Sequence, residues 1–244
     1  MSKIFKTPDD TRYRTLLQEE RAVLNKNREL VNSTNLGAGS RTAADKTYSQ
    51  IAGTSVSPVY KCSILQNISQ QLAPARVLEL GTSLGFSSAA LSIGRPQTSV
   101  ITIEGNEEIA QTARAMHQRL GLTQIEVIVG KFEEIVPVVA ETNGPFDLIY
   151  IDGDHRKVST LHWISLLSGQ LSENGAIIVD DIYWSAEMME AWAEAKSSAQ
   201  FKIKIDLFLM GILIRNNNLS KEIDLKIIPG WMKPTQAGIF SKNL

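Results

Sequence analysis

The sequence has a single cysteine, no long apolar run and no excess of charge of either sign. With Cys62 alone an internal disulfide is impossible, and a reducing setting fits. No apolar stretch approaches the roughly 18 residues that span a bilayer, and the opening residues MSKIFKTPDD lack the apolar core of a signal peptide. We therefore expect a cytoplasmic protein with no membrane partner.

The charge balance limits the partners further. The 25 basic and 26 acidic residues give a net charge of −1, and no long cluster of Lys and Arg occurs. Domains that bind nucleic acid carry a basic surface, so nucleic acid is not expected as a partner. At 244 residues and 43% hydrophobic composition, the chain is long enough for one large α/β domain with an appendage.

Residues 1–55 differ in kind from the rest of the chain. Residues 9–31 are rich in Arg, Glu, Gln and Leu and carry an imperfect apolar stripe, which predicts a helix. Residues 32–58 are dense in Gly, Ser, Thr and Asn, which indicates an irregular segment. This N-terminal arm (1–55) is either solvated or a lid on the substrate side. We separate it from an α/β domain at 56–244.

From Pro58 onward, segments with helical periodicity alternate with short β-branched runs. Strands are expected at 77–80, 99–103, 125–129, 148–151 and 176–179, with Asn174-Gly175 as the turn before the fifth. The runs KIKIDLF (202–208) and GILIR (211–215) are too close for a helical crossover and must pair antiparallel. The pattern predicts a Rossmann-like, doubly wound, seven-stranded and mostly parallel sheet with a C-terminal antiparallel hairpin and an N-terminal helical arm. Residues 223–228 are expected to add an edge strand.

The stretch VLELGTSLGFSSAALSIG (77–94) reads as a strand, a glycine loop and a helix. In an open α/β sheet such a loop lies at the carboxyl end of a strand, where a helix N-terminus presents unpaired N–H groups to a ligand. A dinucleotide fingerprint begun at Gly81 needs glycines where Ser83 and Phe86 stand, and a P-loop needs Lys after Gly85. Dinucleotides and nucleoside triphosphates are therefore disfavoured, and a purely structural glycine turn stays open.

Glu104 ends the second expected strand about 20 residues after this loop. A carboxylate at that place takes the ribose hydroxyls of nucleotide-type ligands in this class of fold. Acidic residues at strand ends also form turns, so the pair of loop and carboxylate carries more weight than either part.

Four aspartates follow two neighbouring strands. Asp152 and Asp154 come after the fourth expected strand, and Asp180 and Asp181 after the fifth. The carboxyl ends of adjacent parallel strands meet at one edge, where these carboxylates repel one another unless a cation offsets them. Mg²⁺ suits such a set of oxygen ligands. The alternative is that Asp154 and Asp181 only cap the helices that come after them.

His155 lies in the same loop and can act as a base near neutral pH, with Asp154 as the alternative base. Tyr183 and Trp184 either line an acceptor pocket or belong to the core. His117 and His162 lie within helical patterns and are expected to be packing or surface residues.

These motifs, with GAGSR (37–41), TIEGN (102–106), IDGDHR (151–156), DDIYWS (180–185) and IDLFLMGI (205–212), resemble class I S-adenosylmethionine-dependent methyltransferases. Within that class they are similar to bacterial O-methyltransferases related to catechol O-methyltransferase and to sugar and macrolide O-methyltransferases with a D-G-D segment. The resemblance covers Pro58 to about Arg215. It implies S-adenosylmethionine as the methyl donor.

The resemblance also assigns residues. Those implied for the cofactor are Glu79, Gly81, Ser83, Gly85, Ser87, Glu104, Gly130, Phe132, Glu133 and Asp152. Those implied for Mg²⁺ are Asp152, Asp180 and Asp181, and the implied catalytic set is His155, Asp152 and Asp154. His155 stands where the catechol enzymes have a lysine that takes the hydroxyl proton. The catechol family commonly has Asp-Asn where this chain has Asp180-Asp181, which argues against a catechol acceptor.

We therefore expect a methyltransferase, with a divalent metal, that acts on a hydroxyl of a small molecule. A homodimer is left open. A metal-independent N- or O-methyltransferase and a non-catalytic nucleoside-binding module on the same fold are the alternatives.

Overall fold

The computed structural model of the chain describes residues 12–31, 46–54 and 57–227. The motif GAGSR, the first residues of the expected N-terminal helix and the tail beyond Pro229 lie outside these residues. No helix in the described ranges is long and apolar enough to cross a membrane.

The centre of the molecule is one mixed sheet with the strand order β3-β2-β1-β4-β5-β7-β6-β8. Its strands are β1 (Arg76–Leu80), β2 (Ser99–Glu104), β3 (Ile125–Val129), β4 (Phe146–Ile151), β5 (Leu171–Asp180), β6 (Ile203–Asp206), β7 (Met210–Ile214) and β8 (Ile223–Lys226). β1 to β5 are parallel, and β7 runs antiparallel between β5 and β6. The expected edge strand is present as β8, which pairs parallel with β6 and makes the sheet eight-stranded. The predicted α/β class and C-terminal hairpin are confirmed.

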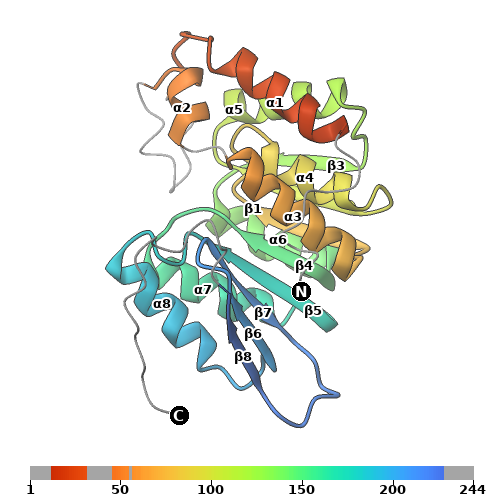
Figure 1. Cartoon of the computed structure of the whole chain (residues 1–244), viewed down its shortest axis with the longest axis vertical. Helices are drawn as coiled ribbons and strands as arrows, with labels where there is room; N and C mark the ends of the chain where they lie inside the picture. The colour runs from red at the N-terminus through yellow and green to blue at the C-terminus, as the bar shows by residue number, and fades with distance from the viewer. Residues whose placement is uncertain (1–11, 32–45, 55–56, 228–244) are drawn as a thin grey trace, which may run out of the picture.

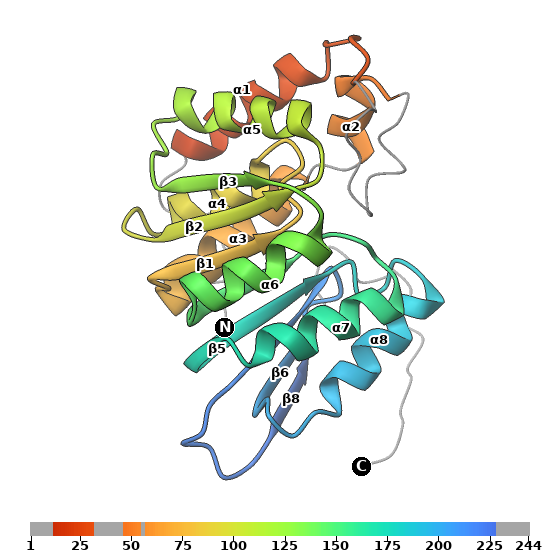
Figure 2. The same cartoon turned by 180° about the vertical axis from the view of Figure 1, so that it is seen from behind.

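Helices cover both faces of the sheet (Figures 1 and 2). They are α1 (Arg12–Leu24), α2 (Tyr48–Thr54), α3 (Val59–Leu72), α4 (Phe86–Gly94), α5 (Glu107–Arg119), α6 (Phe132–Asn143), α7 (Lys157–Ser168) and α8 (Ala186–Lys196). Apolar residues of α1 to α5 pack on one face, and those of α6, α7 and α8 pack on the other. Because alternate strand residues point to opposite faces, Val77 joins the first core and Leu78 the second.

The described part of the N-terminal arm is packed into the first core. Leu17, Leu24 and Ile51 are buried there together with residues of α3 and α4. Arg119 of α5 forms an ion pair with Glu20, and Tyr48 donates a hydrogen bond to Glu108. This packing contradicts a solvated arm for residues 12–31 and 46–54.

One local prediction is wrong. Asn174-Gly175 is not a turn before the fifth strand, because β5 already begins at Leu171. The pairing with β4 is interrupted at this place: Phe146 faces Leu171, but Leu148 faces Ala176. The extra residues of β5 form an irregularity within the strand. An Asn-Gly dipeptide is as typical of such an irregularity as of a turn between two elements.

The pairing register places four strand ends in one row. Leu80 of β1 lies opposite Ile103 of β2 and Ile151 of β4, and Ile151 lies opposite Val179 of β5. The next residues along these strands are Gly81, Glu104, Asp152 and Asp180. The strand order changes direction between β1 and β4, and ligands bind in open α/β sheets at such a switch point.

Candidate active site

The glycine loop after β1 is built by close approach of the chain to itself. Gly81 has φ +102°, and a Cβ there would lie 2.2 Å from the carbonyl oxygen of Asp152. Gly85 has φ +85° and begins α4, where a Cβ would lie 2.6 Å from Nε2 of His117. Both positions therefore require glycine even before a ligand is considered. His117, expected to be a packing or surface residue, is buried and contacts Ser88 Oγ and the Gly85 carbonyl.

Glu104 ties the second strand to this loop. Its Oε2 accepts a hydrogen bond from the backbone N–H of Ser83 at 2.8 Å, and its Oε1 accepts one from Asn106 at 3.0 Å. Burial raises the pKa of Glu104, while these backbone donors oppose the increase. Asn106 also caps α5 as predicted, since its side chain accepts from the N–H groups of Glu108 and Ile109. The carboxylate is thus fixed at the strand end, where a ribose would meet it.

Glu79 lies behind the loop and not on it. Its side chain is fully buried, and Thr102 donates a hydrogen bond to Oε2 at 2.5 Å. The Thr102 hydroxyl also lies 2.6 Å from that of Thr82, which comes directly after Gly81. Burial raises the pKa of Glu79 to about 7. This chain of contacts supports the loop from within the sheet.

A small cavity of about 10 Å³ lies at the loop, lined by Ser57, Thr82, Ser83, Leu84, Phe86, Ser87 and Asp152. The first N–H groups of α4 have no acceptor within the helix, and no side chain caps this helix. Such a helix start suits a carboxylate. A larger cavity, of about 250 Å³, lies around Arg76 and Ser99 at the amino ends of β1 and β2 and is remote from these residues.

Three of the residues implied for the cofactor, Gly130, Phe132 and Glu133, lie between the end of β3 and the first turn of α6. Gly130 has φ +157° and donates its N–H to the carbonyl of Glu104. A Cβ on Gly153 would lie 2.7 Å from the ring of Phe132, so this ring covers the residue after Asp152. Glu133 is exposed.

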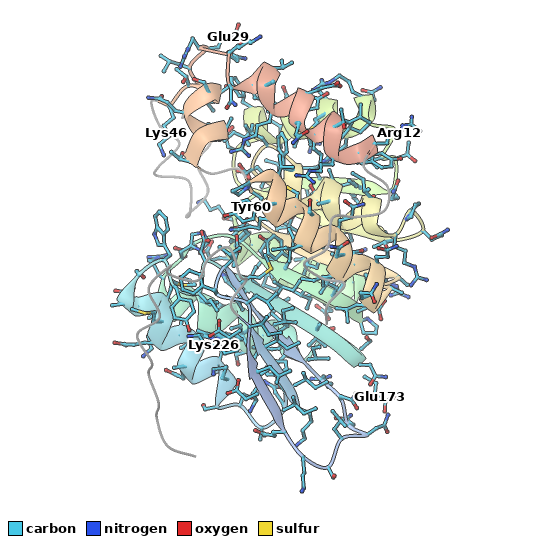
Figure 3. The ribbon with its side chains drawn as sticks, in the orientation of Figure 1. Arg12, Glu29, Lys46, Tyr60, Glu173 and Lys226 are labelled. Atoms are coloured by element: carbon cyan, nitrogen blue, oxygen red, sulfur yellow. The ribbon has the colours of Figure 1, made fainter. Side chains whose placement is uncertain are left out.

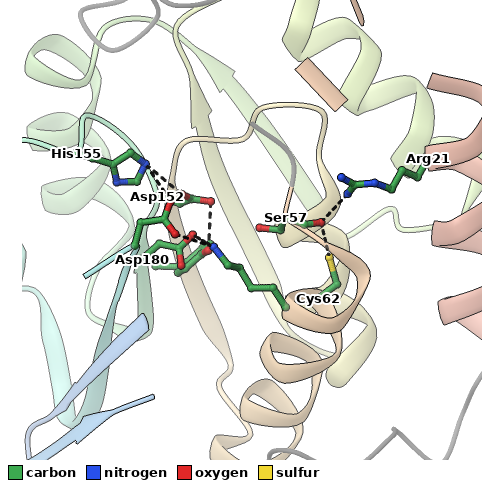
Figure 4. A network of polar contacts seen from close by, with 9 residues as sticks. Arg21, Ser57, Cys62, Asp152, His155 and Asp180 are labelled. Atoms are coloured by element: carbon green, nitrogen blue, oxygen red, sulfur yellow. Dashed lines mark hydrogen bonds and ion pairs between the residues drawn. The ribbon is translucent and has the colours of Figure 1, made fainter. Parts of the chain in front are cut away.

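Two aspartates of the acidic cluster bind a lysine that the sequence motifs did not mark. Lys61 of α3 reaches Asp180 Oδ2 at 2.7 Å and Asp181 Oδ1 at 3.1 Å. Burial lowers the pKa of Lys61, but the charges of Asp180, Asp152 and Asp181 outweigh burial and raise it above the ordinary value. The side chain is therefore an ammonium at neutral pH. Figure 4 shows Asp152, Asp180 and His155 gathered on the side of the cluster away from Cys62.

A signal for Lys61 exists in the sequence. Lys61 precedes Ile64, Leu65 and Ile68 by three, four and seven positions, so it belongs to the buried stripe of α3. Tyr60, one residue earlier and labelled in Figure 3, is exposed by contrast. A lysine on an apolar stripe needs a buried partner.

The second group in the cluster comprises Asp152, His155 and Asp181, whose ligand atoms lie within 4.8 Å of one another. His155 Nε2 is 3.7 Å from Asp152 Oδ1 and 3.9 Å from Asp181 Oδ2. Burial raises the pKa of Asp152 to about 6, and Lys61 opposes this only in part. Burial and the charge of Asp152 raise the pKa of Asp180 as well. Negative charge thus exceeds positive charge, and the donor set fits a divalent cation.

Asp154 does not join this group. It is paired with Arg156, whose Nε and Nη2 both lie 2.5 Å from the carboxylate. Burial raises the pKa of Asp154, but hydrogen bonds from Arg156 and Ser159 bring it below the ordinary value. Arg156 occupies the N-cap position of α7 without a capping side-chain hydrogen bond, and Ser185 caps α8, so neither Asp154 nor Asp181 is at a helix cap. The capping alternative for these aspartates is wrong.

Aromatic side chains border the acids on the β5 side. Trp184 is 74% exposed, and the rings of Tyr183 and Phe208 stack at 5.2 Å. Phe208 has φ +70°, which is unusual for a bulky residue. Tyr183 also donates to Asp206 and accepts from Lys226. Trp184 is therefore not a core residue, and a flat acceptor could lie against it.

Comparisons with known proteins agree with this geometry. Residues 78–182 match the family model "Methyltransferase domain". The chain is 40% identical over 109 residues to a catechol O-methyltransferase of Mycobacterium tuberculosis, which covers 43% of this chain and 47% of that protein. It is 35% identical over 130 residues to a catechol O-methyltransferase of Niastella koreensis, which covers 52% and 57%. The chain thus spans about half the length of these curated relatives.

The fold agrees as well. An O-methyltransferase structure from Bacillus cereus in complex with SAH superposes with a TM-score of 0.59 at 20% identity and covers 86% of this chain and 92% of that one. At this identity the likeness concerns the fold alone. Taken with the sequence match across the glycine loop, Glu104 and the acids, residues 78–182 of this chain are similar to a class I S-adenosylmethionine-dependent methyltransferase domain of the kind found in catechol O-methyltransferases.

Proposed function

We propose that this protein transfers the methyl group of S-adenosylmethionine to a hydroxyl of a small molecule, with a divalent cation at the acidic cluster. The observation that carries the proposal is the row of Gly81, Glu104, Asp152 and Asp180 at the ends of four adjacent strands. It places a nucleoside-type site beside a cluster of metal-type donors, as a two-substrate reaction needs.

The donor would lie along this row. Ser83, Ser87 and the start of α4 suit its amino-acid half, Glu104 its ribose, and Phe132 with Gly130 its adenine. The sulfonium carries the positive charge that activates the methyl group, so the protein mainly aligns the two reactants. Ser57 and Leu84 line the same small cavity as Asp152.

The transfer is a single displacement. The acceptor oxygen forms a bond to the methyl carbon while the carbon–sulfur bond breaks, and the bonding pair stays on sulfur. The hydroxyl proton passes to Nε2 of His155, which faces the oxygens of Asp152 and Asp181. A divalent cation bound by these aspartates would supply Lewis acidity to the acceptor hydroxyl.

Calorimetry with S-adenosylmethionine and S-adenosylhomocysteine tests the cofactor part. We expect both to bind and Glu104→Gln to weaken both by about 10- to 100-fold, because hydrogen bonds to a charged group contribute about 1.5–3 kcal/mol. Glu141→Gln, at an exposed position of α6 that the resemblance does not assign to the cofactor, is the matched control. Failure of the wild type to bind either compound would leave a non-catalytic module on this fold.

Methyl transfer to catechol and to hydroxylated sugars, with and without EDTA, tests the acceptor class and the metal. We expect activity to fall in EDTA and to return with Mg²⁺. Full activity in EDTA would remove the metal and leave methyl transfer intact. A homodimer stays a prediction, which light scattering of the purified protein can check.

A further inference from the structure

Ser57 forms one wall of the small cavity at the glycine loop, and it comes from outside the sheet. It lines the cavity together with Ser83, Ser87 and Asp152, which belong to the ends of β1 and β4 and to the start of α4. Ser57 is buried and directly precedes Pro58, the N-cap residue of α3. The backbone position of Ser57 therefore sets one side of the site proposed for the cofactor.

A guanidinium from α1 holds this backbone. Arg21 Nη1 donates to the carbonyl oxygen of Ser57 at 3.1 Å, and Nη2 donates to that of Ala52 at 2.7 Å. Ala52 belongs to the last turn of α2, where carbonyl groups lack donors within the helix. The N–H groups of an arginine lie in one rigid plane, so a single side chain fixes the two carbonyls relative to each other. Figure 4 shows Arg21 reaching Ser57 from α1.

The other end of α2 is fixed independently of Arg21. Tyr48, the first residue of α2, donates a hydrogen bond to Glu108 of α5 at 2.9 Å. The N-cap residue of α5 in turn donates its N–H to the Glu104 carboxylate at 3.0 Å. Helix α2 is thus anchored on the helix that fixes Glu104, and Arg21 connects this anchored helix to Ser57.

The carbonyl of Ser57 has a second donor, which is weaker. The Cys62 thiol lies 3.5 Å from this oxygen, and a thiol is a poor hydrogen-bond donor. Arg21 is charged, and hydrogen bonds from charged donors are stronger than those between neutral groups. Arg21 therefore contributes most of the side-chain hydrogen bonding that holds Ser57.

We propose that Arg21 is a positioning residue for S-adenosylmethionine, which holds the Ser57 wall of the cavity in place so that the site is formed before the cofactor binds. Arg21 acts through the Ser57 carbonyl and not by contact with the cofactor. A preformed site binds more tightly because less of the chain has to be ordered on binding. The proposal rests on the cofactor part of the proposed function and extends it to α1, which lies outside the matched residues 78–182.

Calorimetric titration of the full chain with S-adenosylhomocysteine tests the proposal without an acceptor. We expect Arg21→Met, which removes both donors, to weaken the binding about tenfold or more. Arg21→Lys keeps the charge but not the planar fork, so the loss should be smaller, about threefold. Arg28→Met is the matched control: Arg28 contacts Ser49 of α2 at 3.0 Å, and its loss should change the affinity by no more than about twofold.

A second control separates positioning from stability. Leu17 is buried on α1, and Leu17→Ala removes core packing but leaves the guanidinium in place. We expect Leu17→Ala to lower the urea midpoint more than Arg21→Met does, yet to bind S-adenosylhomocysteine within about twofold of the wild type. All affinities are measured well below the melting midpoint of each variant. If Arg21→Met does not fold, the comparison of Arg21→Lys with Leu17→Ala decides.

Two results would overturn the proposal alone. One is wild-type affinity in Arg21→Met, or in Arg21→Lys where that variant decides. The other is a loss of affinity in Leu17→Ala as large as that in the Arg21 variant. Both leave the proposed function intact, because the wild type still binds S-adenosylhomocysteine. A wild type that does not bind this compound would overturn the proposal together with the proposed function.

Discussion

Gly81, the first residue of the glycine loop, lies against the backbone of Asp152 at the end of β4. Its replacement by alanine should therefore lower the stability of the fold and weaken cofactor binding. The Gly81→Ala change adds one methyl group at the point where the end of β1 passes closest to the end of β4. Gly81 also donates its N–H to the carbonyl of Ile103, so it cannot move away without loosening the junction with β2.

The expected loss of stability in Gly81→Ala has two sources. At φ +102°, an L-residue incurs about 1–2 kcal/mol of backbone strain. The added Cβ would lie 2.2 Å from the Asp152 carbonyl oxygen, and contacts under 3.0 Å are essentially never found for real Cβ atoms. Strand β4 must therefore shift, and forced shifts in a packed interior cost about 1–3 kcal/mol. We expect the free energy of unfolding to fall by about 2–5 kcal/mol.

Substitutions at two other glycines distinguish the backbone strain from the steric overlap. Gly121 has φ +70° but nothing within 4 Å of the place that an added Cβ would take, so Gly121→Ala should show the backbone strain alone, about 1–2 kcal/mol. Gly53 lies in α2 with nothing within 4 Å, and Gly53→Ala should stabilise the protein by up to about 1 kcal/mol. Urea unfolding followed by circular dichroism measures all three.

Binding of S-adenosylhomocysteine, measured on the same samples, should weaken only in Gly81→Ala. The reasoning fails if Gly81→Ala is no less stable than Gly121→Ala. Equal stability with lost binding would show that the glycine clears space for the cofactor and not for Asp152.

Glu79→Gln should remove a pH dependence of stability: burial raises the pKa of Glu79 to about 7 from 4.5, so the wild type loses up to about 3 kcal/mol as the pH rises from 4.5 through 7. Urea midpoints at pH 5 and pH 8 test this, and equal slopes for wild type and variant would contradict it. Trp184→Ala, at a side chain that is 74% exposed, should change stability by less than about 0.5 kcal/mol but raise KM for an aromatic acceptor several-fold. Val138→Ala, 58% exposed on α6, should change neither quantity.

The parts of the fold that depend on local periodicity were predictable. The alternation of apolar segments gives the parallel strands, and the short spacing between β6 and β7 gives the antiparallel hairpin. The start of β5 was not predictable, because Asn174-Gly175 is a typical turn dipeptide and yet forms an irregularity inside a strand. Only the tertiary pairing with β4 decides between the two.

For the site, the sequence predicted which strand ends lie together but not that the ammonium of Lys61 faces them. The carboxyl ends of parallel strands must meet, so Glu104, Asp152 and Asp180 could be grouped in advance. Lys61 comes from a helix 119 residues earlier than Asp180, and no local rule connects the two. The resemblance also places Glu79 at the cofactor, which stays a prediction; in the structure this side chain is buried.

Figure 4 shows a contact path from α1 to the neighbourhood of the acids. Arg21 of α1 donates to the carbonyl of Ser57, and the same carbonyl accepts from the thiol of Cys62, the neighbour of Lys61. The helix that carries the ammonium is thus anchored by a segment that the family match does not include. A fragment cut to the matched residues 78–182 would keep the glycine loop and every aspartate of the cluster, yet it would lack their counter-charge, Lys61. The recognisable domain is for this reason not a self-sufficient module, and grafting or truncation of this protein has to begin at α1.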